Sequence, residues 1–329
     1  MITRKPKVVV IIANYNGLSA EYNSKPILSI CLNGLKSTKY PNMKLVVADD
    51  SSTDNSLEYI KLHFHGVNSV RMKKNGGYSK NNNNAIRYTL MSYNPDYIVL
   101  LNNDIIIKDP EWLNKMVSMA EKDKRVGIVG CKLLYPGGRV QHAGVKIGMF
   151  PRNSGRGRED MGQYNSVEEV EGITGAVMLI KKKVFSTIGL LDESFYMGYE
   201  DVDYCIMARK AGFKIIYDGN VTLTHLEGFT STNSKNSKIR NNMFYYLVRN
   251  YTYLALKDFG KLKAIIGIIA FPFVSSSITI EDSDRVRGIR GLRFKSNIVR
   301  NMVAAFKAVR AGIKLYSTHK KIHRIVYTT

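Results

Sequence analysis

The chain of 329 residues carries a formal charge of +22, and its hydrophobic fraction of 44% is ordinary for a folded protein. These values exclude a disordered chain and fit one large α/β domain, or one domain with an appendage. The charge predicts a partner rich in phosphate, such as nucleic acid, anionic lipid or a charged substrate.

The spacing of the cysteines and the length of the apolar runs predict the cellular compartment. Cys31, Cys131 and Cys205 are odd in number and far apart, without the spacing of a disulfide framework or a zinc site, so we expect a reducing compartment. The apolar run Val8–Ala13 is too short for a signal peptide or a membrane span, and Ala264–Ile280 is interrupted by a proline and three serines. We therefore predict a cytoplasmic protein.

The first hundred residues alternate between strand-like and helix-like patterns. The expected strands are residues 8–13, 44–49, 69–72 and 97–102, and the expected helices are residues 24–37, 54–63 and 79–92. This βαβ alternation predicts a mostly parallel sheet with right-handed crossovers, flanked by helices.

The middle of the chain is less regular. Residues 126–165 are rich in glycine with short β patterns, and the elements expected afterwards are a strand at 171–180, a helix at 200–211, a strand at 213–217, a loop at 230–238 and a helix at 239–259. No internal repeat is present.

Polar residues follow each of the first four strands. These loops are Asn14–Gly17, Asp49–Asp54, Lys73–Tyr78 and Asn102–Asp104. Ligands of open α/β sheets bind beyond the carboxyl ends of the strands, so we expect a rim of amide and carboxylate groups there, including Asn16, Asn75 and Asn103.

The second and third loops each allow two interpretations. Ser52 or Thr53 can cap a helix beginning near Asp54, whereas Asp49 and Asp50 can accept hydrogen bonds from a ribose or a base. The segment Lys74–Arg87 lacks the spacing of a phosphate loop, and its four asparagines can cap the next helix.

The fourth loop places Asp104 between two apolar runs. A carboxylate there suits a hard divalent ion bridging a diphosphate, with Asn102 as a further oxygen ligand, although Asn and Asp are also common in β-turns.

Two later segments carry candidate chemistry. Glu200, Asp201 and Asp203 open a helix, where acidic residues favour the helix dipole, but preceding aromatic residues can raise a carboxyl pKa and create a general base. His225 at a strand end is either structural or a nitrogen ligand of the same metal.

Six segments together resemble the family 2 glycosyltransferases, especially their rhamnosyltransferase-like branch. They are IIANYNG, VVADDSSTD, NGGYSKNNNNAIRY, YIVLLNNDI, the run from ITGAVMLIKKKVF through FYMGYEDVDYCIMARKAGFKIIYD, and THLEGFTS, in the family's order over roughly residues 7–250. The resemblance implies a GT-A fold over residues 1–259, with a nucleotide-binding half (about 1–104) and an acceptor-binding half (105–259). We expect residues 260–329 to be a basic helical C-terminal region.

The resemblance also implies roles for single residues. Asp201 matches the catalytic base, with Glu200 beside it, and Asp104 and His225 match metal ligands for Mn²⁺ or Mg²⁺. The donor-binding residues are Asn14, Asn16, Asp49, Asp50, Asn75, Gly77 and Asn103, while Gly175 and Trp112 match acceptor-side or packing positions. Asn102 stands where many members have Asp, which lowers the expected metal affinity.

The implied reaction is inverting transfer of a sugar from a nucleotide-diphosphate donor to a hydroxyl of a glycan or glycolipid acceptor. One alternative is a sugar-phosphate nucleotidyltransferase, although the loop Asn14–Lys25 lacks the Gly-rich, basic character that reaction needs. The other is a nucleic-acid-binding protein, which a rim of carboxylates disfavours. We expect no specific nucleic-acid partner.

The tail adds a prediction about membranes. Residues 285–324 contain twelve Lys or Arg and no acidic residue, mixed with apolar residues at near-helical spacing. A core-packing helix with a solvated face is one interpretation. Because such faces usually mix signs, we predict attachment to anionic lipid at the inner face of the membrane, aided by Ile265–Val274.

Overall fold

The computed structural model describes residues 4–227, 237–272 and 298–328, with side chains for 4–227, 243–272 and 303–320. The chain forms two compact units. The first comprises Met1–Ile147, Pro151–Tyr196 and Glu200–Ser234, and the second comprises Gly148–Phe150, Met197–Tyr199 and Lys235–Thr329. The second unit thus includes the helix before position 260 as well as the basic tail.

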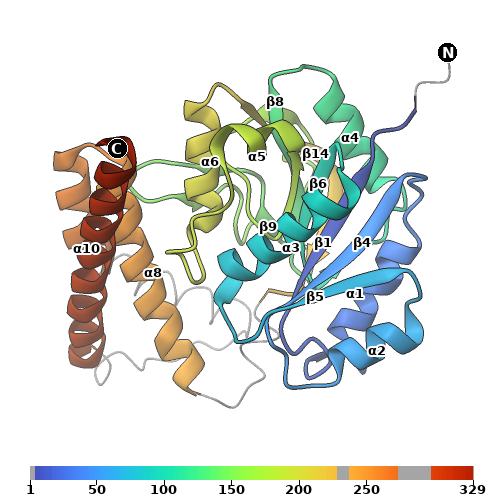
Figure 1. Ribbon diagram of the computed structural model, residues 1–329, viewed down its shortest axis with the longest axis horizontal. Helices are drawn as coiled ribbons and strands as arrows, with labels where there is room; N and C mark the ends of the chain where they lie inside the picture. The colour runs from blue at the N-terminus through green and yellow to red at the C-terminus, as the bar shows by residue number, and fades with distance from the viewer. Residues whose placement is uncertain (1–3, 228–236, 273–297, 329) are drawn as a thin grey trace. The chain divides into compact units, whose positions relative to one another are not determined.

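The first unit is built on one mixed sheet (Figure 1). Its strands are β1 (Val8–Asn14), β4 (Met43–Asp49), β5 (Val67–Arg71), β6 (Tyr97–Asn102), β7 (Ile105–Ile106), β8 (Val126–Leu134), β9 (Val140–His142), β12 (Val167–Glu169), β13 (Val177–Lys181) and β14 (Lys214–His225). Two small hairpins lie outside this sheet. One pairs β2 (Glu21–Tyr22) with β3 (Lys25–Pro26), and the other pairs β10 (Val145–Lys146) with β11 (Arg152–Asn153). The main order is β12-β14-β8-β13-β6-β1-β4-β5, with β7 beside β14 and β9 beside β8.

Helices cover both faces of this sheet, because its central strands are apolar on both sides. In β1, Val8, Val10 and Ile12 face one core, while Val9 and Ile11 face the other. The first core is covered by α1 (Ile27–Lys36), α2 (Ser56–His63) and α4 (Trp112–Glu121), and the second by α3 (Gly77–Tyr93), α5 (Lys182–Ile188) and α6 (Glu200–Lys210). The predicted α/β class is confirmed.

The strand pairing corrects two expectations for the middle of the chain. Residues 126–134, expected to be irregular, form the nine-residue strand β8. Two glycines hid this strand, and one of them is required by packing, because a Cβ at Gly130 would lie 2.3 Å from Ile173. The strand expected at 171–180 begins only at Val177, and it runs antiparallel to β6 and β8 within an otherwise mostly parallel sheet.

Two helix starts also differ from the sequence expectation. Helix α2 begins at Ser56, with the Asp54 carboxylate accepting the Ser56 N–H, so neither Ser52 nor Thr53 caps it. Helix α3 begins at Gly77, which places Asn81 and Asn83 inside the helix rather than at its cap. Both are buried, and they donate hydrogen bonds to the carbonyls of Ala48 and Leu191.

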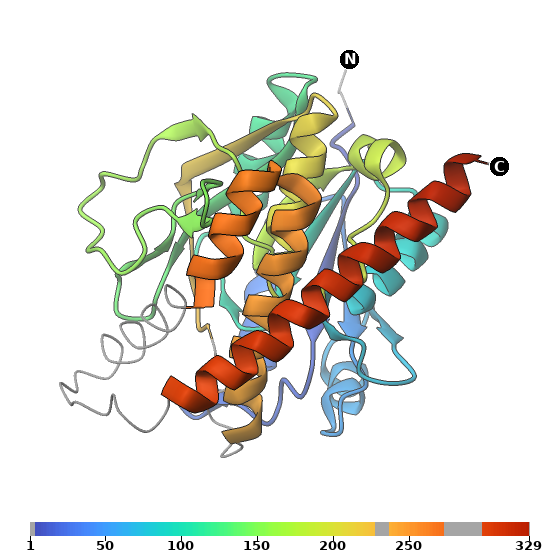
Figure 2. The same ribbon diagram turned by 90° about the vertical axis from the view of Figure 1, so that its left-hand side faces the viewer.

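The second unit is helical. It contains α8 (Ser237–Asp258), a helix at residues 261–272 and α10 (Ile298–Thr328), which lies across α8 in Figure 2. The Tyr251 and Phe271 rings stack at 4.0 Å, and Gly312 lets α10 approach α8, since a Cβ there would lie 2.7 Å from the Cβ of Thr252. The helical character expected of the tail is confirmed from Ile298, while residues 285–297 lie outside the described residues.

Among the described residues, no helix is both long and apolar enough to cross a membrane.

Candidate active site

The first, second and fourth loops of the predicted rim meet because their strands β1, β4 and β6 are neighbours. Strand β1 lies between β4 and β6, with Asn14 opposite Asp49 and Ala13 opposite Asn102. The parallel strands therefore end at one edge of the sheet, and the residues that follow them share a single polar layer.

Amide and carboxylate groups connect this layer. Asn14 Nδ2 donates to Asp49 Oδ2 at 3.1 Å, and Asn14 Oδ1 accepts from Asn103 Nδ2 at 2.7 Å. The other oxygen of Asp49 accepts the Ser52 N–H at 3.0 Å. Because Asp49 is fully buried and each of its two oxygens accepts a hydrogen bond, it fixes the conformation of the loop that follows β4.

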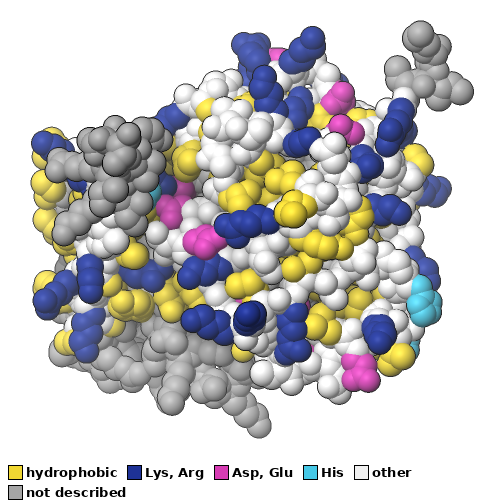
Figure 3. All heavy atoms as spheres, in the orientation of Figure 1, with side chains coloured by type: hydrophobic (Ala, Val, Ile, Leu, Met, Phe, Trp, Pro, Cys, Tyr) yellow, Lys and Arg dark blue, Asp and Glu magenta, His cyan; other side chains and the backbone are white. Residues whose placement is uncertain are grey.

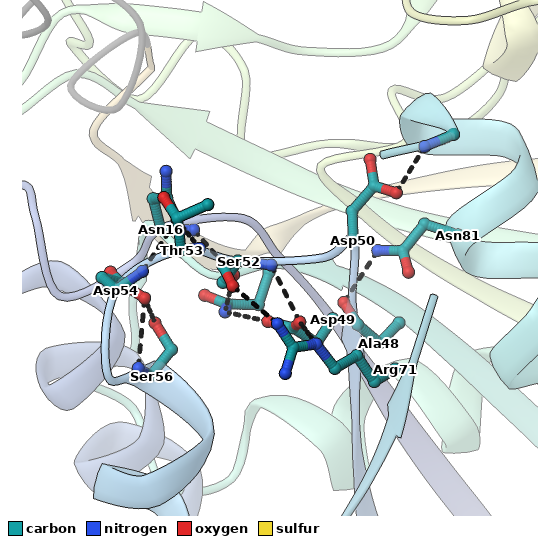
Figure 4. Close-up of polar contacts among 12 residues, drawn as sticks. Asn16, Ala48, Asp49, Asp50, Ser52, Thr53, Asp54, Ser56, Arg71 and Asn81 are labelled. Carbon is teal, nitrogen blue, oxygen red and sulfur yellow. Dashed lines mark hydrogen bonds and ion pairs between the residues drawn. The ribbon is translucent and has the colours of Figure 1, made fainter. Parts of the chain in front are cut away.

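Asn16 ties the first loop to the second. Its Oδ1 accepts the N–H groups of Thr53 at 2.7 Å and Asp54 at 3.3 Å, and its own N–H donates to Ser52 Oγ at 2.9 Å (Figure 4). Asn16 has φ 52° and Ser51 has φ 63°, which are left-handed conformations uncommon for residues other than glycine. Such strain concentrates at functional sites.

Asp50 points away from Asp49 toward the start of α3 (Figure 4). Its two oxygens accept the N–H groups of Gly76 and Gly77 at 2.7 and 2.9 Å. Burial raises the pKa of Asp50, and those two hydrogen bonds partly offset the rise. Asn75, exposed in the same loop, accepts a hydrogen bond from the Tyr196 hydroxyl. The structure thus holds the third loop against the second.

Asp104 and His225 face each other at the end of the sheet, where β14 pairs with β7. Asp104 Oδ1 lies 3.0 Å from His225 Nε2, and Asn102 Nδ2 lies 3.3 Å from the same nitrogen. Asp104 Oδ1 is buried, and among the residues that the structure describes its close polar partner is His225 Nε2, which can donate to it only when that nitrogen carries a proton. Burial lowers the pKa of His225, but the Asp104 carboxylate outweighs this effect and the net pKa is raised.

This arrangement fits a divalent cation. A buried carboxylate oxygen, beside an imidazole nitrogen and a side-chain amide, supplies the ligand types that Mn²⁺ accepts. No group of three or more His, Cys, Asp or Glu side chains suited to a metal occurs among the described residues. Asp104, His225 and Asn102 would therefore share the ion with ligands from the substrate, as is usual for ions bound to diphosphates.

Asp201 lies in the first turn of α6 and accepts the N–H of Gly175 at 2.8 Å. Burial raises its pKa, and hydrogen bonds from Gly175 and Val202 only partly oppose the rise. Tyr78 donates its hydroxyl to the Gly175 carbonyl at 2.6 Å, and the pKa of Tyr78 is held well above its ordinary value by burial and by Glu200 and Asp201. Tyr78 and Asp201 therefore both contact the backbone of Gly175.

The segment Gly175–Ala176 joins the two halves of the site. Gly175 donates to Asp201, and the next carbonyl, Ala176 O, accepts the N–H of Asn102 at 3.0 Å. The candidate base and Asn102, one of the candidate metal ligands, thus contact one short piece of backbone. A Cβ at Gly175 would lie 2.8 Å from the Tyr78 hydroxyl, so a larger residue there would displace Tyr78. Trp112 is fully buried and donates to Thr38 at 2.9 Å, which identifies it as a packing residue.

Sequence reasoning missed two residues that contact this site. Gln141 on β9 accepts a hydrogen bond from His225 Nδ1 at 2.7 Å, and Glu227 accepts one from Gln141 at 3.1 Å. Gln141 lies in a stretch expected to be irregular, and no motif marked it. Only the long-range pairing of β9 with β8 brings it to His225.

Comparison with known proteins agrees with this geometry. The family model of glycosyl transferase family 2 matches residues 10–189. Uncharacterized protein y4gI of Sinorhizobium fredii is 31% identical over 225 residues, which are 63% of this chain and 24% of that protein. The N-acetylglucosaminyl-diphospho-decaprenol L-rhamnosyltransferase of Mycobacterium tuberculosis is 22% identical over 233 residues, which are 63% of this chain and 74% of that protein. The chain thus spans about a quarter of y4gI.

A solved structure shows the same fold. Mannosyltransferase PcManGT from Pyrobaculum calidifontis, in complex with GDP-Man and Mn²⁺, superposes with a TM-score of 0.58 and 16% identity over 93% of this chain and 88% of that one. The predicted GT-A fold is confirmed, and the rhamnosyltransferase among the relatives fits the branch expected from the six motifs. Because the family model covers more than half of the sequence, the chain belongs to glycosyl transferase family 2.

Proposed function

We propose that the protein is an inverting glycosyltransferase that moves a sugar from a nucleotide-diphosphate donor to an acceptor hydroxyl. The observation that carries the proposal is the link from Asp201, a half-buried carboxyl group with a raised pKa, through Gly175–Ala176 to Asn102, which lies beside the Asp104–His225 pair. The family match favours this reaction over nucleotidyl transfer. The named rhamnosyltransferase and mannosyltransferase relatives support a sugar donor.

In this proposal Asp201 is the base. Its ionised carboxylate removes the proton of the acceptor hydroxyl as the oxygen attacks the anomeric carbon from the side opposite the leaving diphosphate. Glu200 begins the same helix, is buried and precedes Asp201 directly in the chain.

The donor is bound by the polar layer. The nucleoside lies over the loops that contain Asn14, Asn16, Asp49, Asp50, Asn75, Gly77 and Asn103. Asp104, His225 and Asn102 would hold Mn²⁺ or Mg²⁺, whose charge stabilises a departing diphosphate. The Mn²⁺ found with GDP-Man in the mannosyltransferase supports this assignment.

The acceptor is a glycan or a lipid-linked sugar. One relative is named as a rhamnosyltransferase of N-acetylglucosaminyl-diphospho-decaprenol, a sugar joined to a decaprenol through a diphosphate. The second unit supports a membrane partner, because its helix at 261–272 exposes Leu262, Ile265, Ile266 and Ile269. We call these four side chains the apolar stripe.

The last helix adds charge and further apolar surface. In α10 the small residues Ala305, Ala308 and Gly312 are buried, while Phe306 is 73% exposed and Ile313 is 47% exposed. Exposed Lys307, Arg310 and Lys314 lie among them, and neither helix contains an acidic residue. Exposed apolar and basic side chains together are the composition of a surface that binds anionic lipid. The proposed location is thus the inner face of the membrane.

The reaction is tested by the Asp201→Asn variant. We expect transfer to fall by roughly 10²–10⁴-fold, the usual contribution of a general base, while donor binding stays close to wild type. Glu193→Gln, which removes a partly exposed carboxylate paired with Arg87, is the matched control and should retain activity. Full activity of Asp201→Asn would transfer the role of base to Glu200.

A further inference from the structure

A chain of hydrogen bonds reaches His225 at Nδ1, on the side of the ring opposite Asp104. The proposed reaction does not itself use this chain. Gln141 Nε2 lies 3.1 Å from Glu227 Oε2. A carboxylate can only accept, so the amide nitrogen of Gln141 must face Glu227 and its oxygen must face the other way. That oxygen, Gln141 Oε1, lies 2.7 Å from His225 Nδ1. The orientation of the Gln141 amide is therefore set by Glu227.

The orientation of the amide sets the tautomer of the imidazole. An acceptor oxygen beside Nδ1 requires a proton on Nδ1, and a neutral imidazole with that proton carries its lone pair on Nε2. Nε2 is the atom that lies 3.0 Å from Asp104 Oδ1. Two electron-rich atoms then face each other, and a cation between them or a second proton on the ring would relieve their repulsion.

Glu227 is itself held in place. Arg156 Nη2 donates to both of its oxygens, at 3.1 and 3.0 Å, and the Tyr135 hydroxyl donates to Oε2 at 2.9 Å. The Arg156 guanidinium also lies 5.7 Å from the centre of the Tyr135 ring. These contacts anchor the carboxylate, so Glu227 can orient Gln141 instead of turning to solvent.

We propose that Gln141 and Glu227 are positioning residues that hold His225 in the Nδ1–H tautomer, so that its Nε2 lone pair and the Asp104 carboxylate face one divalent cation. The inference rests on the cation site of the proposed function. Outer residues that orient a histidine ligand typically contribute about 10–100-fold to metal affinity. The chain Glu227–Gln141–His225 has this arrangement, with an amide between the carboxylate and the imidazole.

The tautomer is measured first, without metal. In ¹⁵N-histidine NMR spectra at alkaline pH, the two ring nitrogens of His225 should show the Nδ1–H form in the wild type. Gln141→Met, which keeps the length of the side chain but removes the acceptor, should shift His225 toward a mixture of tautomers. A wild-type His225 in the Nε2–H form would overturn the proposal.

Metal affinity is measured second, by titration with Mn²⁺ followed by electron paramagnetic resonance. Gln141→Met should bind Mn²⁺ about 10–100-fold more weakly than wild type. Gln163→Met, a change of the same type at an exposed glutamine, should bind as wild type does. Unchanged affinity in Gln141→Met would contradict the proposal.

Exchanging the side chains of Gln141 and Glu227 tests whether the lost Mn²⁺ affinity can be restored. In Gln141→Glu combined with Glu227→Gln, the new amide can donate to the new carboxylate, which still accepts from His225 Nδ1. The double variant should recover most of the lost Mn²⁺ affinity, whereas Gln141→Glu alone places two carboxylates together and should not. A double variant no better than Gln141→Glu would count against the hydrogen-bond chain. Wild-type protein that binds no Mn²⁺ would instead overturn the cation site of the proposed function, and the metal-free tautomer distinguishes the two failures.

Discussion

Two opposing effects act on the pKa of the Asp201 carboxyl group. Two backbone N–H groups donate to its carboxylate and favour the ionised form, while burial favours the protonated form. Burial is the larger effect, so the pKa of Asp201 is raised. A base with a raised pKa binds the acceptor proton more strongly, which suits removal of a proton from a hydroxyl.

The first prediction concerns the pH dependence of transfer. Because the ionised form of Asp201 is the active one, kcat/KM should fall as the pH is lowered through its raised pKa. The fall should therefore begin at a higher pH than for an ordinary aspartate, whose pKa is about 3.9. The profile should be measured at saturating Mn²⁺, which separates the base from protonation of the metal ligands. A profile that stays flat down to the ordinary range of aspartate would argue against Asp201 as the base.

The second prediction concerns Asp104. Asp104→Ala removes the buried carboxylate that lies 3.0 Å from His225, and Mn²⁺ binding should be lost. Donor binding should then no longer respond to the metal. Asp109→Ala is the matched control, since Asp109 is a partly exposed carboxylate paired with Lys115 in the same stretch of chain. Equal Mn²⁺ affinity in the two variants would rule out Asp104 as a ligand.

At the scale of elements, the loop between β5 and α3 is held by a close backbone approach. Gly77 has φ +80°, and a Cβ there would lie 2.3 Å from the carbonyl oxygen of Tyr196. Tyr78 N donates to the same carbonyl at 2.7 Å. The start of α3 can therefore lie beside the segment that leads to α6 only because residue 77 has no side chain.

The third prediction compares two glycines. Gly77→Ala places a side chain at an unfavourable φ and brings its Cβ into a clash with the backbone. Gly66→Ala also meets an unfavourable φ, +87°, but its Cβ would have no atom within 4 Å. The strained φ alone costs roughly 1–2 kcal/mol. Gly77→Ala should therefore lower the free energy of unfolding, measured with urea, by more than Gly66→Ala does, and it should weaken donor binding. Similar losses in the two variants would show that the approach to Tyr196 is unimportant.

The sequence predicted those helices and strands whose apolar residues recur at a regular helix-like or strand-like spacing. The buried run of β1 and the polar residues at the ends of β4 and β6 were found, and with them Asp49, Asp104 and the acidic start of α6. It did not predict β8, because glycines at 127 and 130 interrupt the apolar pattern for reasons of packing that only the folded chain shows. Gln141 was missed for a similar reason, since its role depends on the pairing of β9 with β8.

At the scale of the whole molecule, positive charge dominates. Lys and Arg side chains are spread over the face shown in Figure 3, where Asp and Glu side chains are few. The formal charge of +22 exceeds what solubility requires of a domain. Such a surface attracts anionic partners, and the proposed partner is lipid, because α10 and the helix at 261–272 expose apolar as well as basic side chains.

The fourth prediction concerns vesicles. Wild-type protein should sediment with anionic phosphatidylglycerol vesicles at low salt and less with phosphatidylcholine vesicles. Changing Leu262, Ile265 and Ile269 of the apolar stripe to Ser should release it. The matched control changes three other exposed apolar residues, Leu62, Met91 and Met161, to Ser and should remain bound. Wild-type protein that stays in the supernatant with anionic vesicles would refute the membrane partner.

The central claim is that the polar rim binds a nucleotide-diphosphate sugar together with a divalent cation. Its most direct test is the thermal unfolding midpoint of the wild type with a panel of nucleotide sugars, with Mn²⁺ or with excess chelator. A donor at about 100 times its Kd stabilises the folded state by roughly 2.7 kcal/mol, which raises Tm measurably. We predict that at least one donor raises Tm with Mn²⁺, that chelator abolishes the rise, and that Asp104→Ala does not show it. A panel in which no nucleotide sugar raises Tm, with or without metal, would contradict the account.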